Sequence, residues 1–280
     1  TGMDTYLEKY HIPAVDYSEG VKTAYPQGVQ AKEFILPKEL LEQDCVISLS
    51  KMKTHALERI TGAVKNSYGF VYGFHKAKGH TQYPSADSFA RMLIDLNKCV
   101  APKLYVMDGI VAMEGNGPGS GDPVPMNVLL MSTDPVALDS VFSRLVYLKP
   151  EMVPTNYHGE KMGLGTWKEE EITLLTPDGE ISMAEAVKKY GNPAFNVDRT
   201  EVRKNIWTRM AGALNIFQKK PYIEADKCVR CGICVQSCPV PGKAVDFRKG
   251  KGKPPVYDYR KCIRCFCCQE MCPKKAIKVK

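Results

Sequence analysis

Two copies of one cysteine pattern occur near the end of the chain: Cys228-Val-Arg-Cys231-Gly-Ile-Cys234-Val-Gln-Ser-Cys238-Pro239 and Cys262-Ile-Arg-Cys265-Phe-Cys-Cys268-Gln-Glu-Met-Cys272-Pro273. Each copy reads C-x2-C-x2-C-x3-C-P. Corresponding residues lie 34 positions apart, as from Cys228 to Cys262. Eight cysteines and two prolines in the same register indicate an internal repeat.

This spacing is typical of proteins that hold four-iron, four-sulfur clusters. Three closely spaced cysteines can surround one cluster, and in two-cluster ferredoxins the fourth cysteine of each run binds the other cluster. We therefore expect two [4Fe-4S] clusters. The ligands of one would be Cys228, Cys231, Cys234 and Cys272, and those of the other Cys262, Cys265, Cys268 and Cys238.

Two other uses of these cysteines are less compatible with the spacing. Paired C-x2-C motifs also build zinc sites, but a zinc ion with four ligands has no use for a third cysteine at the same interval. Structural disulfides are disfavoured because the C-x2-C loops are too tight for a set of them. We expect Cys267 to be a packed bystander, with redox tuning or cluster repair as the alternative, and Cys45 and Cys99 to be small core residues.

Length and composition indicate a globular chain of two domains. It has 280 residues, of which 44% are hydrophobic and 25% charged, and no apolar run is long enough to span a bilayer. Free thiolates for clusters favour a reducing compartment, hence the cytoplasm. Because the chain opens Thr-Gly-Met, we expect that an N-terminal part of the first domain is missing.

Positive charge is concentrated at the end of the chain. Residues 219–280 contain 16 Lys and Arg against 5 Asp and Glu, an excess of +11, which leaves −3 of the chain's +8 for residues 1–218. Part of this excess compensates the clusters' negative charge, and the remainder can steer an acidic redox partner protein. We do not expect nucleic-acid binding, because aromatic residues do not interleave with the basic ones.

Strands and helices alternate in residues 1–218, which predicts an α/β domain with a mostly parallel sheet. We expect a small α+β ferredoxin-like domain over 219–280, stabilised by its clusters. The predicted strands cover 12–17, 33–36, 45–49, 103–107, 126–131 and 172–175. The predicted helices cover 38–43, 57–67, 89–96, 134–146, 182–190 and 202–217.

Polar residues follow two of these strands, where open α/β sheets bind ligands. One group begins at Ser50, and the other contains Asp108 and Glu114. The first could hold a phosphate or carboxylate, with a histidine for proton transfer, or could be a solvated rim. Its basic and polar members are Lys51, Lys53, His55, Lys65, Asn66, Lys76 and His80.

A glycine-rich loop runs from Gly115 through Gly117 to Gly121. It does not match G-x-G-x-x-G, and the prolines at 123 and 125 prevent a helix from starting there, so a Rossmann phosphate loop is not expected. Its backbone could approach a ligand, or the loop could be mobile. Asp134 before a proline predicts a helix N-cap rather than a metal ligand, and Asp139 could be a ligand or a hydrogen-bond acceptor.

Four segments resemble the iron–sulfur family called domain of unknown function 362: Ser50–His55, Thr61–Gly69, Asp108–Pro118 and Ser132–Asp139. Many members of that family end in a two-cluster ferredoxin and have a further α/β portion before the point where this sequence begins. The resemblance implies a shared pocket but no particular reaction. Its members would be Lys51, Lys53, His55, Lys65, Asn66, His80, Asp108, Glu114 and Asp139.

These observations favour an oxidoreductase whose clusters exchange electrons with a small anionic substrate or cofactor in the α/β domain. The candidate catalytic residues are His55, Lys65, His80 and Asp108. The candidate binding residues are Lys51, Lys53, Asn66, Glu114, Gly115, Gly117 and Asp139. A non-enzymatic electron carrier and a metalloprotein maturation factor are the alternatives.

Overall fold

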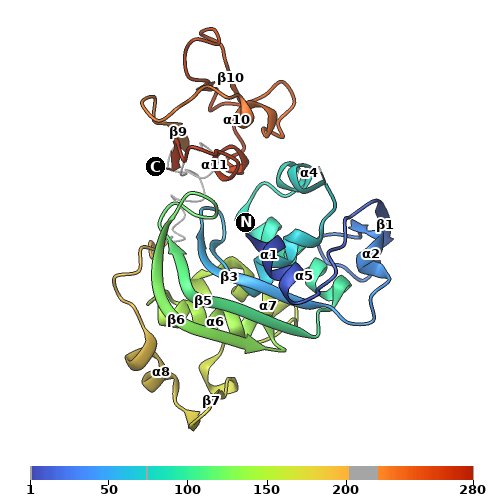
Figure 1. Ribbon diagram of the computed structural model, residues 1–280, viewed down its shortest axis with the longest axis vertical. Coiled ribbons are helices and arrows are strands. Elements are labelled where there is room, and N and C mark those ends of the chain that lie inside the picture. Colours follow the sequence, from blue (N-terminus) through green and yellow to red (C-terminus); the bar gives the residue numbers. More distant parts are fainter. Residues whose placement is uncertain (1, 74, 202–219, 280) are drawn as a thin grey trace, which may run out of the picture.

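The computed structural model describes residues 2–73, 75–201 and 220–279. A four-stranded sheet with helices forms the larger part of the molecule, and the cysteine-rich segment forms a separate module above it (Figure 1). The module lies over the loop between β5 and β6 and beside α4 (Figure 1).

The central sheet has the order β4-β3-β5-β6. Its strands are β3 (Ile47–His55), β4 (Arg59–Thr61), β5 (Leu104–Glu114) and β6 (Asp122–Ser132). Only β3 and β5 are parallel, while β3–β4 and β5–β6 are antiparallel. The prediction of a mostly parallel sheet is therefore wrong. Two of the three connections are short turns, which join antiparallel strands, and only the path from β4 to β5 is long enough for a helical crossover.

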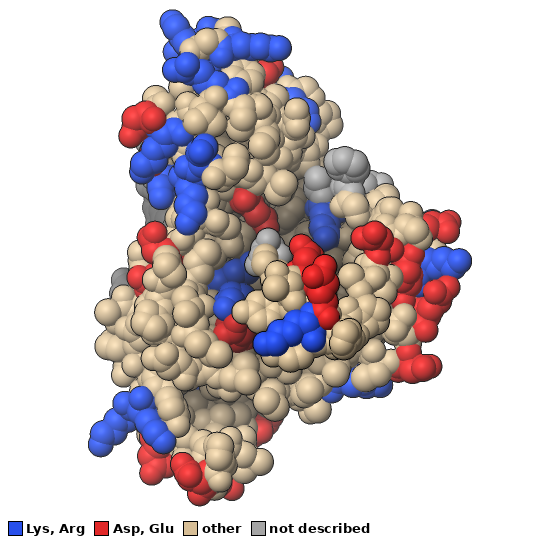
Figure 2. All heavy atoms as spheres, viewed as in Figure 1, with Lys and Arg blue, Asp and Glu red and all other residues tan. Residues whose placement is uncertain are grey.

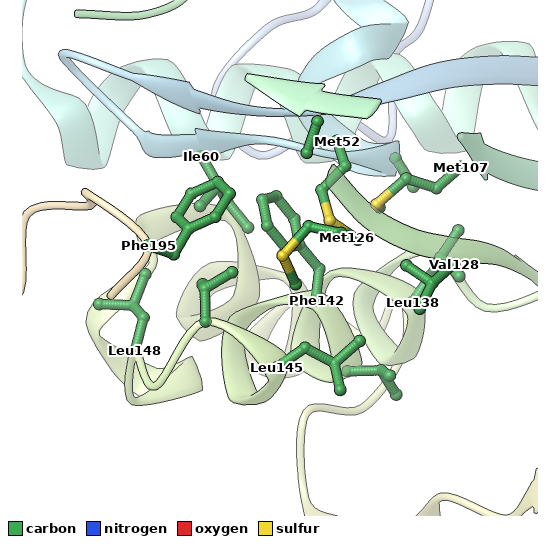
Figure 3. Close-up of a cluster of buried hydrophobic side chains, with 14 of the residues drawn as sticks. Met52, Ile60, Met107, Met126, Val128, Leu138, Phe142, Leu145, Leu148 and Phe195 are labelled. Carbon is green, nitrogen blue, oxygen red and sulfur yellow. The ribbon is translucent and has the colours of Figure 1, made fainter. Parts of the chain in front are cut away.

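Helices cover one face of this sheet. They are α3 (Ala63–Asn66), α5 (Ala86–Val100), α6 (Pro135–Leu145) and α7 (Pro154–Lys161). Met52 and Met107 of the sheet pack with Phe142 of α6 and with Phe195 in one apolar cluster (Figure 3). A second cluster surrounds Phe89 and Leu93 of α5.

The opposite face of the sheet is exposed. Leu49 of β3 and Leu129 of β6 are 72% and 54% exposed there. Lys51 and Asp108 form an ion pair of 2.5 Å between neighbouring strands, with both side chains more than 40% exposed.

The remaining described elements lie around the sheet. They are α1 (Met3–Lys9), β1 (Gly20–Ala24), β2 (Glu33–Pro37), α2 (Lys38–Leu41), η1 (Ser67–Phe70), α4 (His75–Gln82), η2 (Pro150–Met152), η3 (Glu169–Glu171), β7 (Leu174–Thr176), β8 (Gly179–Ile181) and α8 (Met183–Tyr190).

Several local predictions differ from this structure. No strand forms at 12–17, and the helix predicted at 57–67 is replaced by β4 and the short α3. The predicted helix at 202–217 lies outside the described residues. Cys45 is exposed, so its prediction as a core residue is wrong, while Cys99 is partly buried.

The cysteine-rich module repeats its backbone as well as its sequence. Strand β9 (Pro221–Ile223) pairs with β12 (Ile277–Val279), and β10 (Val245–Asp246) pairs with β11 (Val256–Tyr257). Two short helices lie within the cysteine runs, α10 (Ile233–Gln236) in the first and α11 (Cys267–Glu270) in the second. Arg230 and Arg264, 34 residues apart, both have positive φ, near 58° and 56°. The module therefore has internal pseudo-twofold symmetry.

The module docks on the glycine-rich loop through side-chain to backbone hydrogen bonds. Gln269 of α11 donates through Nε2 to the carbonyl oxygens of Asn116 and Gly117, at 2.9 and 3.0 Å. Asn116 donates in turn to the carbonyl oxygen of Ile277 at 3.1 Å, and Lys275 donates to that of Gly121 at 3.1 Å. The loop thus holds the module against the sheet.

Glycine is required in this loop because other backbone approaches it closely. A Cβ atom at Gly117 would lie 2.0 Å from the carbonyl oxygen of Thr54 in β3. One at Gly119 would lie 2.8 Å from the carbonyl oxygen of Glu270 in α11. The close approach anticipated for this loop is therefore to protein backbone on both sides.

Candidate iron–sulfur and junction site

Two small cavities in the module are each lined by four of the repeated cysteines. The walls of one contain Cys228, Cys231, Cys234 and Cys272, which we call the first set. The walls of the other contain Cys238, Cys262, Cys265 and Cys268, which we call the second set. Each set takes three cysteines from one run and one from the other, which is the exchange that a two-cluster ferredoxin requires.

The donor sets suit clusters rather than one ion each. In the described parts of the chain, no three or more His, Cys, Asp or Glu side chains are arranged to hold a single metal ion. A cubane spreads its thiolates around four irons, so its ligands need not meet at one point. Four cysteines around each cavity fit that requirement.

Hydrogen bonds reach the cysteine sulfurs in both sets. The backbone N–H of Ala244 donates to Cys238 Sγ and that of Ala276 to Cys272 Sγ, both at 3.3 Å. The hydroxyl of Tyr257 donates to Cys268 Sγ at 3.1 Å. Donors of this kind orient a ligand and stabilise its negative charge.

The extra thiol, Cys267, is buried beside the second set. Cys267 and Cys265 are joined by a hydrogen bond. This bond is the main cause that raises the pKa of Cys267 and lowers the pKa of Cys265. Cys267 therefore contacts a candidate ligand, although it does not line either four-cysteine cavity.

The second set is the one next to the α/β domain. Helix α11, which follows Cys265 and carries Glu270, lies at the boundary with the sheet, whereas α10 lies farther away (Figure 1). Burial raises the pKa of Tyr68 in the α/β domain, and the negative charges of Cys267, Glu270 and Cys265 raise it further.

Facing this boundary is a group of buried ionisable side chains, His55, Glu58, Lys65 and His80, which we call the buried polar set. Each is at most 8% exposed. His55 is the last residue of β3, Glu58 lies in the turn before β4, Lys65 is in α3 and His80 is in α4. Four separate elements therefore build it.

Lys65 has the least compensated charge in this set. Burial lowers its pKa, against the opposing effects of Glu270 and Glu58. Among the described residues it has no hydrogen-bond or ion-pair partner, and its Nζ lies 5.9 Å from the ring centre of Tyr68. A buried cation without a bonded anion is costly, so this position suits a negatively charged ligand.

Both histidines of the set are held neutral by burial. Burial lowers the pKa of His80 to about 3 and that of His55 well below its usual range. Nδ1 of His55 accepts hydrogen bonds from the N–H groups of Leu57 and Glu58, both at 3.1 Å, so its proton lies on Nε2. His80 stacks on Phe89 with 4.5 Å between ring centres, and its Nδ1 has no partner among the described residues.

Glu58 is the carboxyl group of the set. It is fully buried, and neither of its side-chain oxygens has a hydrogen-bond partner in the described parts of the chain. Burial raises its pKa well above the usual range, although Lys65 acts in the opposite direction. The sequence interpretation missed Glu58 because residues 57–67 looked helical, with only the apolar positions assigned to a buried face.

A cavity of about 440 Å³ lies at the junction of the α/β domain and the module. His55, Gly115 and Gly117 line it from the α/β side, and Tyr222 and Lys278 line it from the module. A second cavity of about 370 Å³ lies beside α4 and is lined in part by Tyr68 and His75. His55 thus connects the buried polar set to the first cavity.

Lys53 and Lys76 border the buried polar set. Burial lowers the pKa of both lysines, whereas the charge of Glu270 raises it. The structure therefore brings together Lys53, His55, Lys65, Lys76 and His80 from the predicted cationic group.

Other candidate residues lie elsewhere. Lys51 and Asp108 pair on the outer face of the sheet, and Asn66 donates to the carbonyl oxygen of Leu49 at 3.1 Å. Glu114 accepts from the backbone N–H of Asn196 at 2.7 Å. Their proposed part in a shared pocket stays a prediction.

Two aspartates have helix-capping geometry. Asp134 accepts from the N–H groups of Val136 and Ala137 at 2.8 and 2.9 Å, which confirms the predicted N-cap. Asp139 is fully buried, and its carboxylate accepts hydrogen bonds from the backbone N–H groups of Ala63 and Val64 at the start of α3. Burial raises the pKa of Asp139 to about 7. Asp139 therefore positions Lys65 through the backbone of α3.

In the described residues, no helix combines the length and apolar character that crossing a membrane requires.

Comparison with known proteins gives two family matches. The family "Domain of unknown function (DUF362)" matches residues 1–144, and the "4Fe-4S dicluster domain" matches residues 220–273. A thylakoid-associated protein of Synechocystis sp. is 42% identical over 160 residues, which are 56% of this chain and 49% of that protein. The chain thus spans about half the length of this relative. No solved structure matches.

The dicluster match falls on the module whose two cavities are lined by four cysteines each. The other match covers β3, the buried polar set, the glycine-rich loop and most of α6. Since that match extends over more than half of the 280 residues, the chain belongs to the DUF362 family and carries a C-terminal 4Fe-4S dicluster domain.

Proposed function

We propose that the protein is an oxidoreductase that carries electrons through two [4Fe-4S] clusters to or from an anionic substrate or cofactor at the domain junction. The first and second cysteine sets would each hold one cluster, which supplies one-electron transfer when bound. The observation that supports this proposal is that α11, which carries Cys268 of the second set, is hydrogen-bonded to the loop that lines the same cavity as His55.

The residues of the junction have complementary abilities. Lys65 offers a buried positive charge to an anionic group, and neutral His55 can donate a hydrogen bond from Nε2. Glu58, held protonated by burial, can supply a proton to a ligand that gains an electron. A site beside His55 and Lys65 would therefore couple electron arrival to charge neutralisation.

The far side of the module suits an acidic redox partner protein. The loop between β10 and β11 exposes four basic side chains, and Figure 2 shows blue spheres gathered over this top end of the module. They are Arg248, Lys249, Lys251 and Lys253. Like charges in such a cluster steer a partner of opposite charge. An electron would then enter at the end of the module opposite the buried polar set.

We place this activity in a reducing compartment, the cytoplasm, because candidate cluster ligands must remain thiolates. The Synechocystis relative is named as thylakoid-associated. That name favours a place of action beside a membrane surface. No helix of the described residues has enough length and apolar character to cross the membrane itself.

The test compares anionic and uncharged oxidants of the same ring system. Protein prepared without oxygen should contain about eight irons per chain. After reduction with dithionite, it is mixed with anthraquinone-2-sulfonate or with an uncharged hydroxymethyl anthraquinone, and reoxidation is followed by absorbance. We expect Lys65→Met to slow reoxidation by the sulfonate about tenfold or more and to leave the uncharged oxidant nearly unaffected.

Lys149→Met is the matched control, because Lys149 is an exposed lysine of the α/β domain that pairs with Glu201. It should leave both rates unchanged. Equal rates for the two oxidants in wild-type protein and in Lys65→Met would favour the alternative of a non-enzymatic electron carrier.

A further inference from the structure

The hydroxyl of Tyr257 makes a contact that distinguishes the two cysteine sets. It donates a hydrogen bond to Cys268 Sγ at 3.1 Å, and Tyr257 itself lines the cavity of the second set. Its ring stacks on Tyr259, with 5.6 Å between centres and 15° between planes. The stacked ring holds the hydroxyl in place against the sulfur.

The internal repeat shows what the first set has at the same position. Thirty-four residues before Tyr257 stands Ile223, which lines the cavity of the first set. Both residues end the corresponding strands, β11 and β9. Isoleucine has no hydrogen-bond donor in its side chain, so it cannot reproduce the phenol contact.

One pair of backbone hydrogen bonds to the cysteine sulfurs is matched between the sets. The N–H of Ala244 reaches Cys238 in the second set and that of Ala276 reaches Cys272 in the first, both at 3.3 Å. Among the described residues, two side-chain donors distinguish the second set: the hydroxyl of Tyr257, and Cys267, which is hydrogen-bonded to Cys265. Thirty-four residues before Cys267 stands Ile233, whose side chain has no donor. The two environments are therefore unequal.

A hydrogen bond to a ligand sulfur favours the reduced form of a cluster, because reduction adds negative charge. The buried cation Lys65 lies on the same side as the second set and acts in the same direction. Burial by Phe266, which lines this cavity, acts the opposite way, because added charge is less stable away from water. The hydrogen bond from the Tyr257 hydroxyl would offset this unfavourable effect of burial on the reduced form of the cluster.

We propose that Tyr257 tunes the reduction potential of the cluster held by the second set above that of the first, so that an electron comes to rest beside the α/β domain. The step is a transfer of one electron between two cysteine-bound centres. The first is oxidised by one electron, the second is reduced by one, and no bond or proton is exchanged. A low-potential one-electron donor supplies the electron. This inference rests on the proposed function.

The test is a potentiometric titration followed by absorbance and by electron paramagnetic resonance, which reads potentials rather than activity. Wild-type protein should show two unequal potentials. Tyr257→Phe keeps the ring and removes only the hydroxyl. We expect this variant to reduce the equilibrium constant for reduction of the higher-potential cluster about tenfold. That change lowers its potential by about 59 mV for one electron. The lower potential should not change.

Tyr259→Phe is the matched control, because the hydroxyl of Tyr259 donates to the carbonyl oxygen of Pro221 and to no sulfur. Both potentials should stay at their wild-type values. If Tyr257→Phe loses iron, Ile223→Tyr tests the inference instead. A phenol at that position should raise the lower potential and so reduce the difference between the two potentials.

Two results would overturn the inference: Tyr257→Phe with both potentials unchanged, or with only the lower one shifted. Failure of the proposed function looks different. In that case wild-type protein lacks about eight irons or [4Fe-4S] signals, or shows both while Lys65→Met does not change its response to the anionic oxidant.

Discussion

The module and the α/β domain are stabilised in different ways. The α/β domain has two extended apolar clusters, with fully buried Phe89, Phe142 and Phe195 among their members. The buried cluster of the module consists of cysteines with Ala244, Val245 and Ile277. So small a core cannot hold a fold of this size alone, and bound clusters would supply the remainder.

The two regions also build their chemistry differently. In the module, each cysteine run supplies three members of one set within seven residues of sequence. In the α/β domain, His55, Glu58, Lys65 and His80 come from four elements. Loss of one cysteine should therefore disrupt its whole set in the module. The buried polar set of the α/β domain should depend instead on the packing that positions each of its members.

The largest effect is expected from a cysteine of the second set. Cys265→Ser should reduce iron from about eight to about four per chain or fewer and should unfold the module, because a cubane needs all of its thiolates. Iron analysis and circular dichroism measure this. Cys267→Ser, two residues away and outside both four-cysteine cavities, should retain the iron. Equal iron loss in both variants would contradict the assignment.

Two aspartates test how far the α/β site depends on buried packing. Asp139→Ala removes the acceptor of two backbone N–H groups in the interior and should cost about 2–4 kcal/mol in the free energy of unfolding. Asp108→Ala breaks an exposed ion pair and should cost less than about 1 kcal/mol. Urea unfolding of both variants gives the comparison, and similar losses would show that Asp139 is not a buried cap.

The glycine-rich loop is where the two regions meet. Gly117→Ala would place its Cβ 2.0 Å from the carbonyl oxygen of Thr54, so the loop must shift. We expect a loss of about 1–3 kcal/mol, as for other overpacked sites, together with slower electron transfer across the junction. Gly69→Ala is the control, because no atom lies within 4 Å of its added Cβ. Urea unfolding and stopped-flow reduction measure the two effects.

The smallest effect is a dependence on pH. Burial depresses the pKa of His80 to about 3, while an unfolded histidine titrates near 6.5. The unfolded state then binds more protons as pH falls below 6.5, so stability decreases. Between pH 7.5 and 5.5, His80 should contribute a loss of about 1.4 kcal/mol. His80→Gln should remove that part of the slope, and an unchanged slope would show that His80 is not buried as a neutral ring.

The cysteine sets could be predicted because their members lie close in sequence and repeat at a fixed interval. Helix α6 and its cap at Asp134 were also readable, since capping signals are local. The sheet was not, because strand direction depends on which connections turn back, and a hairpin at residues 115–121 looked like a loop beyond a parallel strand.

The buried polar set was only partly predictable. Lys53, His55 and Lys65 drew attention through their residue types near a strand end, but Lys51 and Asp108 have the same types and lie on the exposed face. Lys51, Lys53 and His55 stand at alternate positions of β3, so the two-residue period of a strand does not separate them. They differ because the pairing with β5 becomes irregular between Lys51 and Lys53, and the strand is more buried beyond that point. Neither Glu58 nor the docking role of Gln269 carries any signal in sequence spacing.

The docking contacts have a consequence for damage by oxygen. Gln269 follows Cys268 directly, and it holds the module to the loop through two backbone carbonyl oxygens. If oxygen strips iron from the second set, α11 loses the framework that aims this side chain. The contacts between the module and the α/β domain near Lys65 would then loosen, so loss of this cluster would also open the anion site that we propose there.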